Sequence, residues 1–379
     1  MKLTTFAPVL IVTGLIGFAG AGSFVAAQRR GAPAPAAAAG SVLTRTVAAA
    51  NAFLASLDEG QRAKAAFPFD TPQKKNWSNL PSGIFTRNSL RLGDMTAPQR
   101  TAAMALMSTV LSREGYEKAV NIMEADEALK NASPARRGAP AAAPAPSTGA
   151  PAPGAPAPAK GGRGGGGSTI FGKDEYFLAL LGAPSTTTPW QIQFGGHHLG
   201  INITIVGPRS VITPSLPATQ PATFTLNGQT IRPLGDEYDK GFALINALTA
   251  AQREKAILSY RVTNLVLGPL EDGKVIQPEG ILATELTPAQ QTMLFDVVRE
   301  WVGMLNDEAA NERMADIRSN LAKTYFAWSG STTVGEVAYY RIQGPTMVIE
   351  YAPQGNLEHI HTIYRDPTND YGSSLAAPR

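Results

Sequence analysis

Residues 133–168 of this 379-residue chain consist almost wholly of Pro, Ala and Gly. They read SPARRGAPAAAPAPSTGAPAPGAPAPAKGGRGGGGS, with almost no large apolar side chain. Such a segment buries too little apolar surface to offset the entropy lost on ordering, so we predict a disordered linker. The sequence that can fold is thereby confined to residues 41–132 and 169–379. That length allows one large domain or two smaller ones.

The first 27 residues have the composition of a secretory signal peptide. Lys2 is followed by a long apolar run that ends in small residues at Val25–Ala27. This pattern predicts export to the periplasm or the extracellular space. An uncleaved anchor is the alternative, because the run is nearly long enough to span a bilayer. After cleavage we expect no stable membrane span, and residues 28–40 read as a Pro/Ala tether.

The chain contains no cysteine, which excludes disulfides, thiolate metal sites and a cysteine nucleophile. Its net charge of +3 is spread without a basic stripe, so we expect no nucleic-acid partner. The G-x-S-x-G and H-E-x-x-H motifs are both missing, so serine hydrolases and zincins lack their signatures here. An unidentified small-molecule or extracellular substrate is the remaining expectation.

Apolar periodicity predicts an α+β fold. Within residues 41–132, three segments repeat apolar side chains at helical spacing, and Thr96 with Pro98 marks one helix start. Residues 67–95, rich in aromatic and turn residues, read as an ordered irregular loop over the core. Residues 236–258 are also helical in pattern, and residues 287–321 read as a pair of helices, with Thr287 capping the first. Residues 324–366 read as four sequential strands with short links, typical of an antiparallel meander. We therefore expect a helical layer packed on an antiparallel sheet, interrupted by the long disordered insertion.

The chain has only four histidines, and they occur in two tight clusters, His197–His198 and His359–His361. Side chains at i and i+2 of a strand share one face, so His359 and His361 should lie side by side. Adjacent histidines can both reach one ion only where the backbone is irregular. The two glycines before His197 would permit such a break. His359 and His361 are therefore predicted metal ligands, joined by at least one of His197 and His198, with zinc or copper as the metal that suits imidazole.

Carboxylates follow or precede the second histidine pair. Glu350, Asp366 and Asp370 are predicted as ligands or as catalytic bases acting on a metal-bound water. The alternative for the two aspartates is turn chemistry in the sequence RDPTNDYG. Three further polar side chains are expected to line the pocket: Gln193, Arg341 and Arg365.

The segments QFGGHHLG, YYRIQGPTMVIEYAPQ and HIHTIYRDPTNDYG resemble a family known only as domain of unknown function 3500. The resemblance covers most of the chain after the tether. It implies that residues 41–132 and 169–379 are two parts of one domain around an inserted linker. It also implies that both histidine clusters, Arg365–Asp366 and Asp370–Gly372 belong to the family pattern. No activity comes with the resemblance.

The first hypothesis from the sequence is an exported metal-binding protein, with metal-dependent hydrolysis at the histidine cluster. A non-enzymatic module that binds a metal or another ligand is the second. An envelope structural protein with structural histidines is the third. The sequence leaves open whether the chain is an enzyme.

Overall fold

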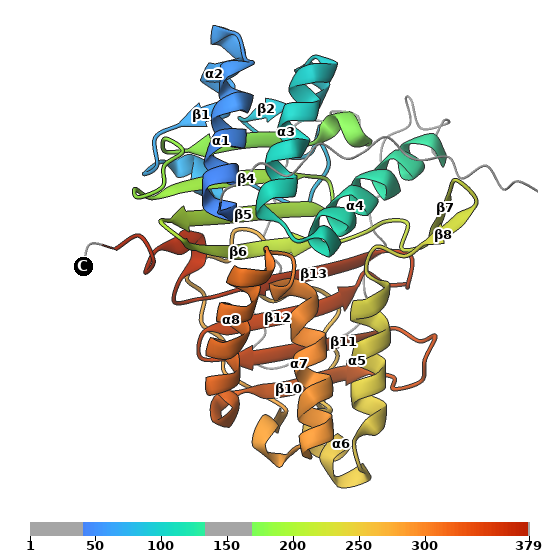
Figure 1. Ribbon diagram of the computed structural model, residues 1–379. Coiled ribbons are helices and arrows are strands. Elements are labelled where there is room, and N and C mark those ends of the chain that lie inside the picture. The colour runs from blue at the N-terminus through green and yellow to red at the C-terminus, as the bar shows by residue number, and fades with distance from the viewer. Residues whose placement is uncertain (1–40, 133–168, 378–379) are drawn as a thin grey trace, which may run out of the picture. The chain divides into compact units, whose positions relative to one another are not determined.

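The computed structural model describes residues 41–132 and 169–377 (Figure 1). The predicted signal peptide, the tether and the linker at 133–168 lie outside these residues. The described residues belong to one compact unit. Among them, no helix combines the length and the apolar character needed to cross a membrane.

A single large sheet runs through the described part of the chain. Its strand order is β1-β3-β4-β5-β6-β13-β12-β11-β10-β9, and β2 adds to β3. All pairs are antiparallel except β1 with β3, so the sheet is mixed where an antiparallel one was predicted. The strands are β1 (Ala66–Phe67), β2 (Leu90–Arg91), β3 (Phe177–Leu181), β4 (Trp190–Gly196), β5 (Leu199–Val206), β6 (Arg209–Pro217), β9 (Ile281–Leu282), β10 (Tyr325–Gly330), β11 (Ala338–Gly344), β12 (Met347–Pro353) and β13 (Ile360–Arg365); a separate hairpin joins β7 (Phe224–Leu226) and β8 (Gln229–Ile231).

Helices cover one face of the sheet, and in Figure 1 they lie in front of it. The α+β class is thereby confirmed, although the helical segment predicted over 236–258 is two helices, because Leu248 leaves helical geometry. The α-helices are α1 (Val42–Ala55), α2 (Glu59–Ala65), α3 (Ala97–Val110), α4 (Arg113–Ala132), α5 (Gly235–Ala247), α6 (Ala250–Ala256), α7 (Pro288–Val302) and α8 (Asp307–Ser319). Short 3₁₀ turns are η1 (Pro72–Lys75), η2 (Leu92–Asp94), η3 (Lys173–Glu175), η4 (Ala283–Glu285), η5 (Leu321–Lys323) and η6 (Asp370–Gly372).

The chain builds the same arrangement twice. The first half, α1 to β6, has two helices, the two short strands β1 and β2, two more helices and four longer strands in order. The second half, α5 to β13, repeats this order, with Ile257 bridging in parallel to Trp328 as β1 pairs in parallel with β3. The order of the longer strands is symmetric about the antiparallel β6–β13 pair, with β3-β4-β5-β6 on one side and β10-β11-β12-β13 on the other. The two halves are therefore related by an approximate two-fold axis at that pair.

The helix starts repeat in atomic detail. Gln61 and Gln99 each close a capping box on their own helix and exchange amide hydrogen bonds of 3.1 and 2.7 Å. Gln252 and Gln290 do the same at one constant offset along the chain, with bonds of 2.9 and 3.0 Å. Each glutamine thus satisfies a helix terminus and ties two helices together.

The helices of the two halves also join each other. Ser112 N–H donates to Met304 C=O at 3.0 Å, and Asn306 N–H donates to Val110 C=O at 3.1 Å. Beside this junction Lys118 donates to the fully buried Glu237 at 2.6 Å. The two halves form one body through these bonds and through the continuous sheet.

Candidate metal centre

The first histidine pair forms the tight turn between β4 and β5. Gly196 pairs with Leu199, so His197 and His198 are the two turn residues. His198 has φ +61°, in the left-handed region, while the preceding glycines remain in β4. The predicted break at the glycines is therefore wrong. His198 N–H donates to Asn79 C=O at 3.1 Å, and Ala218 N–H donates to His198 C=O at 2.8 Å; these bonds hold the turn.

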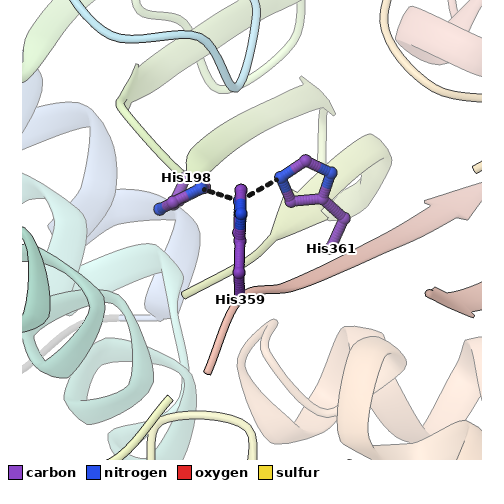
Figure 2. A group of neighbouring side chains, drawn as sticks. All are labelled: His198, His359 and His361. Atoms are coloured by element: carbon purple, nitrogen blue, oxygen red, sulfur yellow. Dashed lines mark hydrogen bonds between the residues drawn. The ribbon is translucent and has the colours of Figure 1, made fainter. Parts of the chain in front are cut away.

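Three imidazoles converge at one point (Figure 2). His198 Nε2 lies 2.9 Å from His359 Nε2, and His359 Nε2 lies 2.9 Å from His361 Nε2. Ligand atoms of all three lie within 4.8 Å of one another. Zinc–nitrogen bonds near 2.0–2.1 Å place tetrahedral ligands roughly 3.3 Å apart, so little movement is needed to seat an ion. We call these three residues the histidine triad.

The second pair reaches the triad as its spacing predicts. His359 immediately precedes β13, and His361 is the second residue of that strand. Thr362 Oγ1 accepts from Trp301 Nε1 of α7, so Thr362 faces the helices. Because neighbouring strand residues alternate, His361 faces the opposite side of the sheet. The triad lies on that face.

The triad is held in its neutral form. His198 is buried, and the other two histidines are half-buried. Burial lowers the pKa of His359 to about 4 and that of His361 to about 3, and it lowers the pKa of His198 well below its usual range. Neighbouring imidazoles add to each shift. Neutral imidazole is the form that ligates transition metals.

His197 does not join the triad. Its Nδ1 lies 2.6 Å from Asp126 Oδ1, and its ring stacks on His198 with centroids 3.7 Å apart. Asp126 Oδ2 accepts from Gly172 N–H at 2.7 Å. The result is a buried carboxylate–imidazole pair directly beside the triad. Asp126 was not predicted as a site residue. Its position on the apolar, buried face of α4 could have indicated a buried polar partner.

Loop residues 78–87 lie in the stretch predicted as an irregular loop, but their contacts with the triad and the histidine turn were not predicted. Asn79 Nδ2 lies 3.2 Å from His361 Nε2. Arg87 Nη2 donates to Ser78 C=O, Leu80 C=O and Gly196 C=O at 2.6–2.8 Å, which ties this loop to the histidine turn. Burial lowers the pKa of Arg87 to about 10. No local sequence pattern marks either residue, because the contacts join distant segments.

The three predicted carboxylates are bound elsewhere. Glu350 Oε2 accepts from Val266 N–H at 2.6 Å and Leu267 N–H at 3.3 Å. Asp366 pairs with Arg313 at 2.9 Å. Asp370 accepts from Thr213 Oγ1 and pairs with Arg365 at 2.7 Å. Burial raises the pKa of all three carboxyl groups. Their catalytic role stays a prediction, and no contact with the triad supports it.

The predicted pocket residues also have other partners. Gln193 donates to Asn202 Oδ1 on the next strand at 3.0 Å. Arg341 Nη2 donates to Glu279 at 2.8 Å. Arg365 pairs with Asp272 at 2.9 Å in addition to Asp370. The Gln193 contact joins β4 to β5, and the two arginine contacts tie the sheet to irregular segments that cover it.

The chain belongs to the family described as "Protein of unknown function (DUF3500)". The family model matches residues 39–373, on both sides of the linker, and confirms the resemblance seen in the sequence. No curated protein and no solved structure matches the chain.

Proposed function

We propose that this member of the family binds one divalent transition-metal ion through His198, His359 and His361, and uses it to activate water for hydrolysis. The convergence of three Nε2 atoms from two distant segments carries the proposal. An Nε2 atom bears either a proton or a lone pair. His359 Nε2 therefore cannot donate to one neighbouring imidazole and accept from the other, whereas one cation would bind all three Nε2 atoms. Zinc and copper are the metals that this donor set suits.

The internal repeat argues that the fold itself does not need these histidines. Gly344 and Met347 bracket the β11–β12 turn as Gly196 and Leu199 bracket the histidine turn. The equivalent turn residues are Pro345 and Thr346. When the β5–β6 pairing is compared residue by residue with the β12–β13 pairing, Arg209 and Val211 of β6 stand at the positions of His359 and His361. The equivalent turn and strand positions thus form without any histidine.

The triad leaves coordination positions for a substrate. Three nitrogen ligands with one open position are the arrangement of many hydrolytic zinc sites, where the metal lowers the pKa of bound water. The His197–Asp126 pair lies against His198 and holds the ring of that metal ligand in place. The half-buried state of His359 and His361 leaves the centre within reach of a small molecule.

The proposal includes export. The composition of residues 1–27, with Lys2, a long apolar run and small residues at its end, supports a secretory signal. A disulfide-free chain of this length can bury enough core to be stable outside the cytoplasm.

The first test is metal analysis of the purified tag-free protein by inductively coupled plasma mass spectrometry, before and after incubation with zinc or copper. The His359→Ala/His361→Ala variant is compared with Arg209→Ala/Val211→Ala, which alters the equivalent positions of the repeat. We expect about one ion per chain in the wild type and the repeat variant. The histidine variant should lose it.

Each other result has a defined meaning. Absence of metal from the wild type after reconstitution overturns the proposal and leaves the structural reading of the histidines. Bound metal without hydrolysis of a panel of esters, amides and phosphoesters favours a non-enzymatic metal-binding module. Equal loss of metal in both variants would mean that folding, not ligation, had been disturbed.

A further inference from the structure

Exposed aliphatic side chains gather beside the triad. Leu80, Ile84 and Ile170 are 43%, 53% and 47% exposed, and exposed apolar side chains that cluster are typical of a binding surface. Ser82, which lies between the first two, accepts a 3.0 Å bond from Ile170 N–H, so the three belong to one surface. We call Leu80, Ile84, Ile170 and the half-buried Phe171 the apolar shelf.

Both ends of the apolar shelf are joined to the metal centre. Leu80 follows Asn79, whose side chain lies 3.2 Å from His361 Nε2. At the other end the Phe171 ring contacts the His197 ring, with centroids 5.0 Å apart, and His197 stacks on His198. The shelf is therefore continuous with the triad and is not a separate patch.

The loop that carries Leu80 and Ile84 is fixed in place. Arg87 Nη2 donates to three backbone carbonyls, two within the loop and one at the end of β4, next to the histidine turn. Its guanidinium also lies over the rings of Phe85 and Phe177, at 5.3 and 5.6 Å from their centroids. A surface held this firmly keeps its aliphatic side chains exposed instead of folding them inward, and such a surface suits a ligand.

We infer that the metal centre takes a ligand with a polar, metal-binding end and an aliphatic or aromatic tail, and that the tail lies on the apolar shelf. This inference rests on the proposed metal site and names its substrate class. Acyl esters, acyl amides and related amphiphiles have this chemistry. Covering the exposed side chains would remove their apolar surface from water, so affinity should rise with tail length.

The test measures binding of two hydroxamates to the zinc-loaded protein by isothermal titration calorimetry. Hydroxamates chelate zinc, and acetohydroxamate and octanohydroxamate differ only in the tail. We expect octanohydroxamate to bind at least about tenfold more tightly. In the Leu80→Ser/Ile84→Ser/Ile170→Ser variant the two affinities should become nearly equal, with zinc content and acetohydroxamate affinity unchanged.

A control variant separates the shelf from general surface apolarity. Val275→Ser/Val334→Ser alters two residues that are 79% and 66% exposed, on a covering segment and a hairpin of the second half. It should retain the wild-type preference for the longer tail. If the control variant loses that preference, or the shelf variant keeps it, the inference is wrong.

The remaining outcomes separate this inference from the proposed function. Equal affinity of both hydroxamates for the wild type overturns the shelf and leaves the metal site intact. Zinc binding without binding of either hydroxamate shows a closed coordination sphere, which overturns the hydrolytic proposal and the shelf together. Absence of zinc binding overturns the metal site and everything that depends on it.

Discussion

His198 in the first half of the chain lies with its Nε2 atom 2.9 Å from Nε2 of His359 in the second half. The triad is thus assembled across the boundary between the two repeated halves. An ion bound there links the β4–β5 turn to the start of β13, in addition to the single sheet that already joins them. Metal binding should therefore be visible in the stability of the whole domain.

The first prediction concerns this linkage. Excess zinc should raise the melting temperature of the chelator-treated protein by several degrees, since a ligand at a hundred times its Kd adds about 2.7 kcal/mol. His198→Asn should abolish the rise but keep the metal-free melting temperature, because asparagine tolerates the left-handed backbone at φ +61°. Differential scanning fluorimetry with and without zinc measures both. An equal zinc shift in the variant would remove His198 from the site.

Local patterns in the sequence predicted part of this architecture well. The i, i+2 spacing of His359 and His361 placed both on one face of a strand, because strand alternation needs no knowledge of distant residues. The Thr-Pro starts of α3 and α7 were equally local, since the capping threonine contacts its own first turn.

The rest depended on contacts between distant segments. The histidine turn was displaced from the glycines because Asn79 and Ala218 hold His198 in a left-handed conformation. Asp126 and Asn79 meet the histidines only after α4 and the 78–87 loop have packed. Strands β1, β2 and β9 have two residues each, too few to show any period. The repeat is carried mainly by element order and by short sequence matches, such as Gln61–Arg62 with Gln252–Arg253 and Thr96 with Thr287, which are too brief to stand out in the sequence.

The paired glutamines provide the second prediction. Gln99→Ala and Gln290→Ala should each lower the free energy of unfolding by about 1–3 kcal/mol, because each removes a capping-box partner and a bond between helices. Equal effects are expected from the equivalent positions of the repeat. Urea denaturation measures them, with Gln229→Ala on the exposed β8 strand as the control. A loss no larger than that of the control would show that the glutamine pair is dispensable.

The third prediction concerns Gly115, in the first turn of α4. A Cβ atom there would lie 2.3 Å from Met304 C=O, at the junction between the two halves. Gly115→Ala should cost about 3 kcal/mol, since backbone on both sides prevents relaxation. Gly60→Ala is the matched helical control, because its nearest neighbour is 3.5 Å away. It should stabilise the protein by about 0.5–1 kcal/mol. Similar effects of the two substitutions would contradict the close contact at the junction.

The last prediction is a pH dependence at the buried Lys118–Glu237 pair. Burial raises the pKa of Glu237 although Lys118 opposes the shift, so the folded state holds a proton here more readily than the unfolded state. Stability from this group is present below the unfolded pKa and is lost as pH rises through the folded pKa. Lys118→Met removes the opposing charge and leaves the carboxylate unpaired, at a cost of about 3–5 kcal/mol near neutral pH.

Urea denaturation at pH 7.5 and pH 5 tests this sign. The cost of Lys118→Met should be smaller at pH 5, because protonation of Glu237 removes the buried charge. Lys118→Met/Glu237→Gln should recover much of the loss at pH 7.5, since the glutamine is neutral at both pH values. A pH-independent loss that the second substitution does not repair would instead assign the role of Lys118 to its bonds with Glu300.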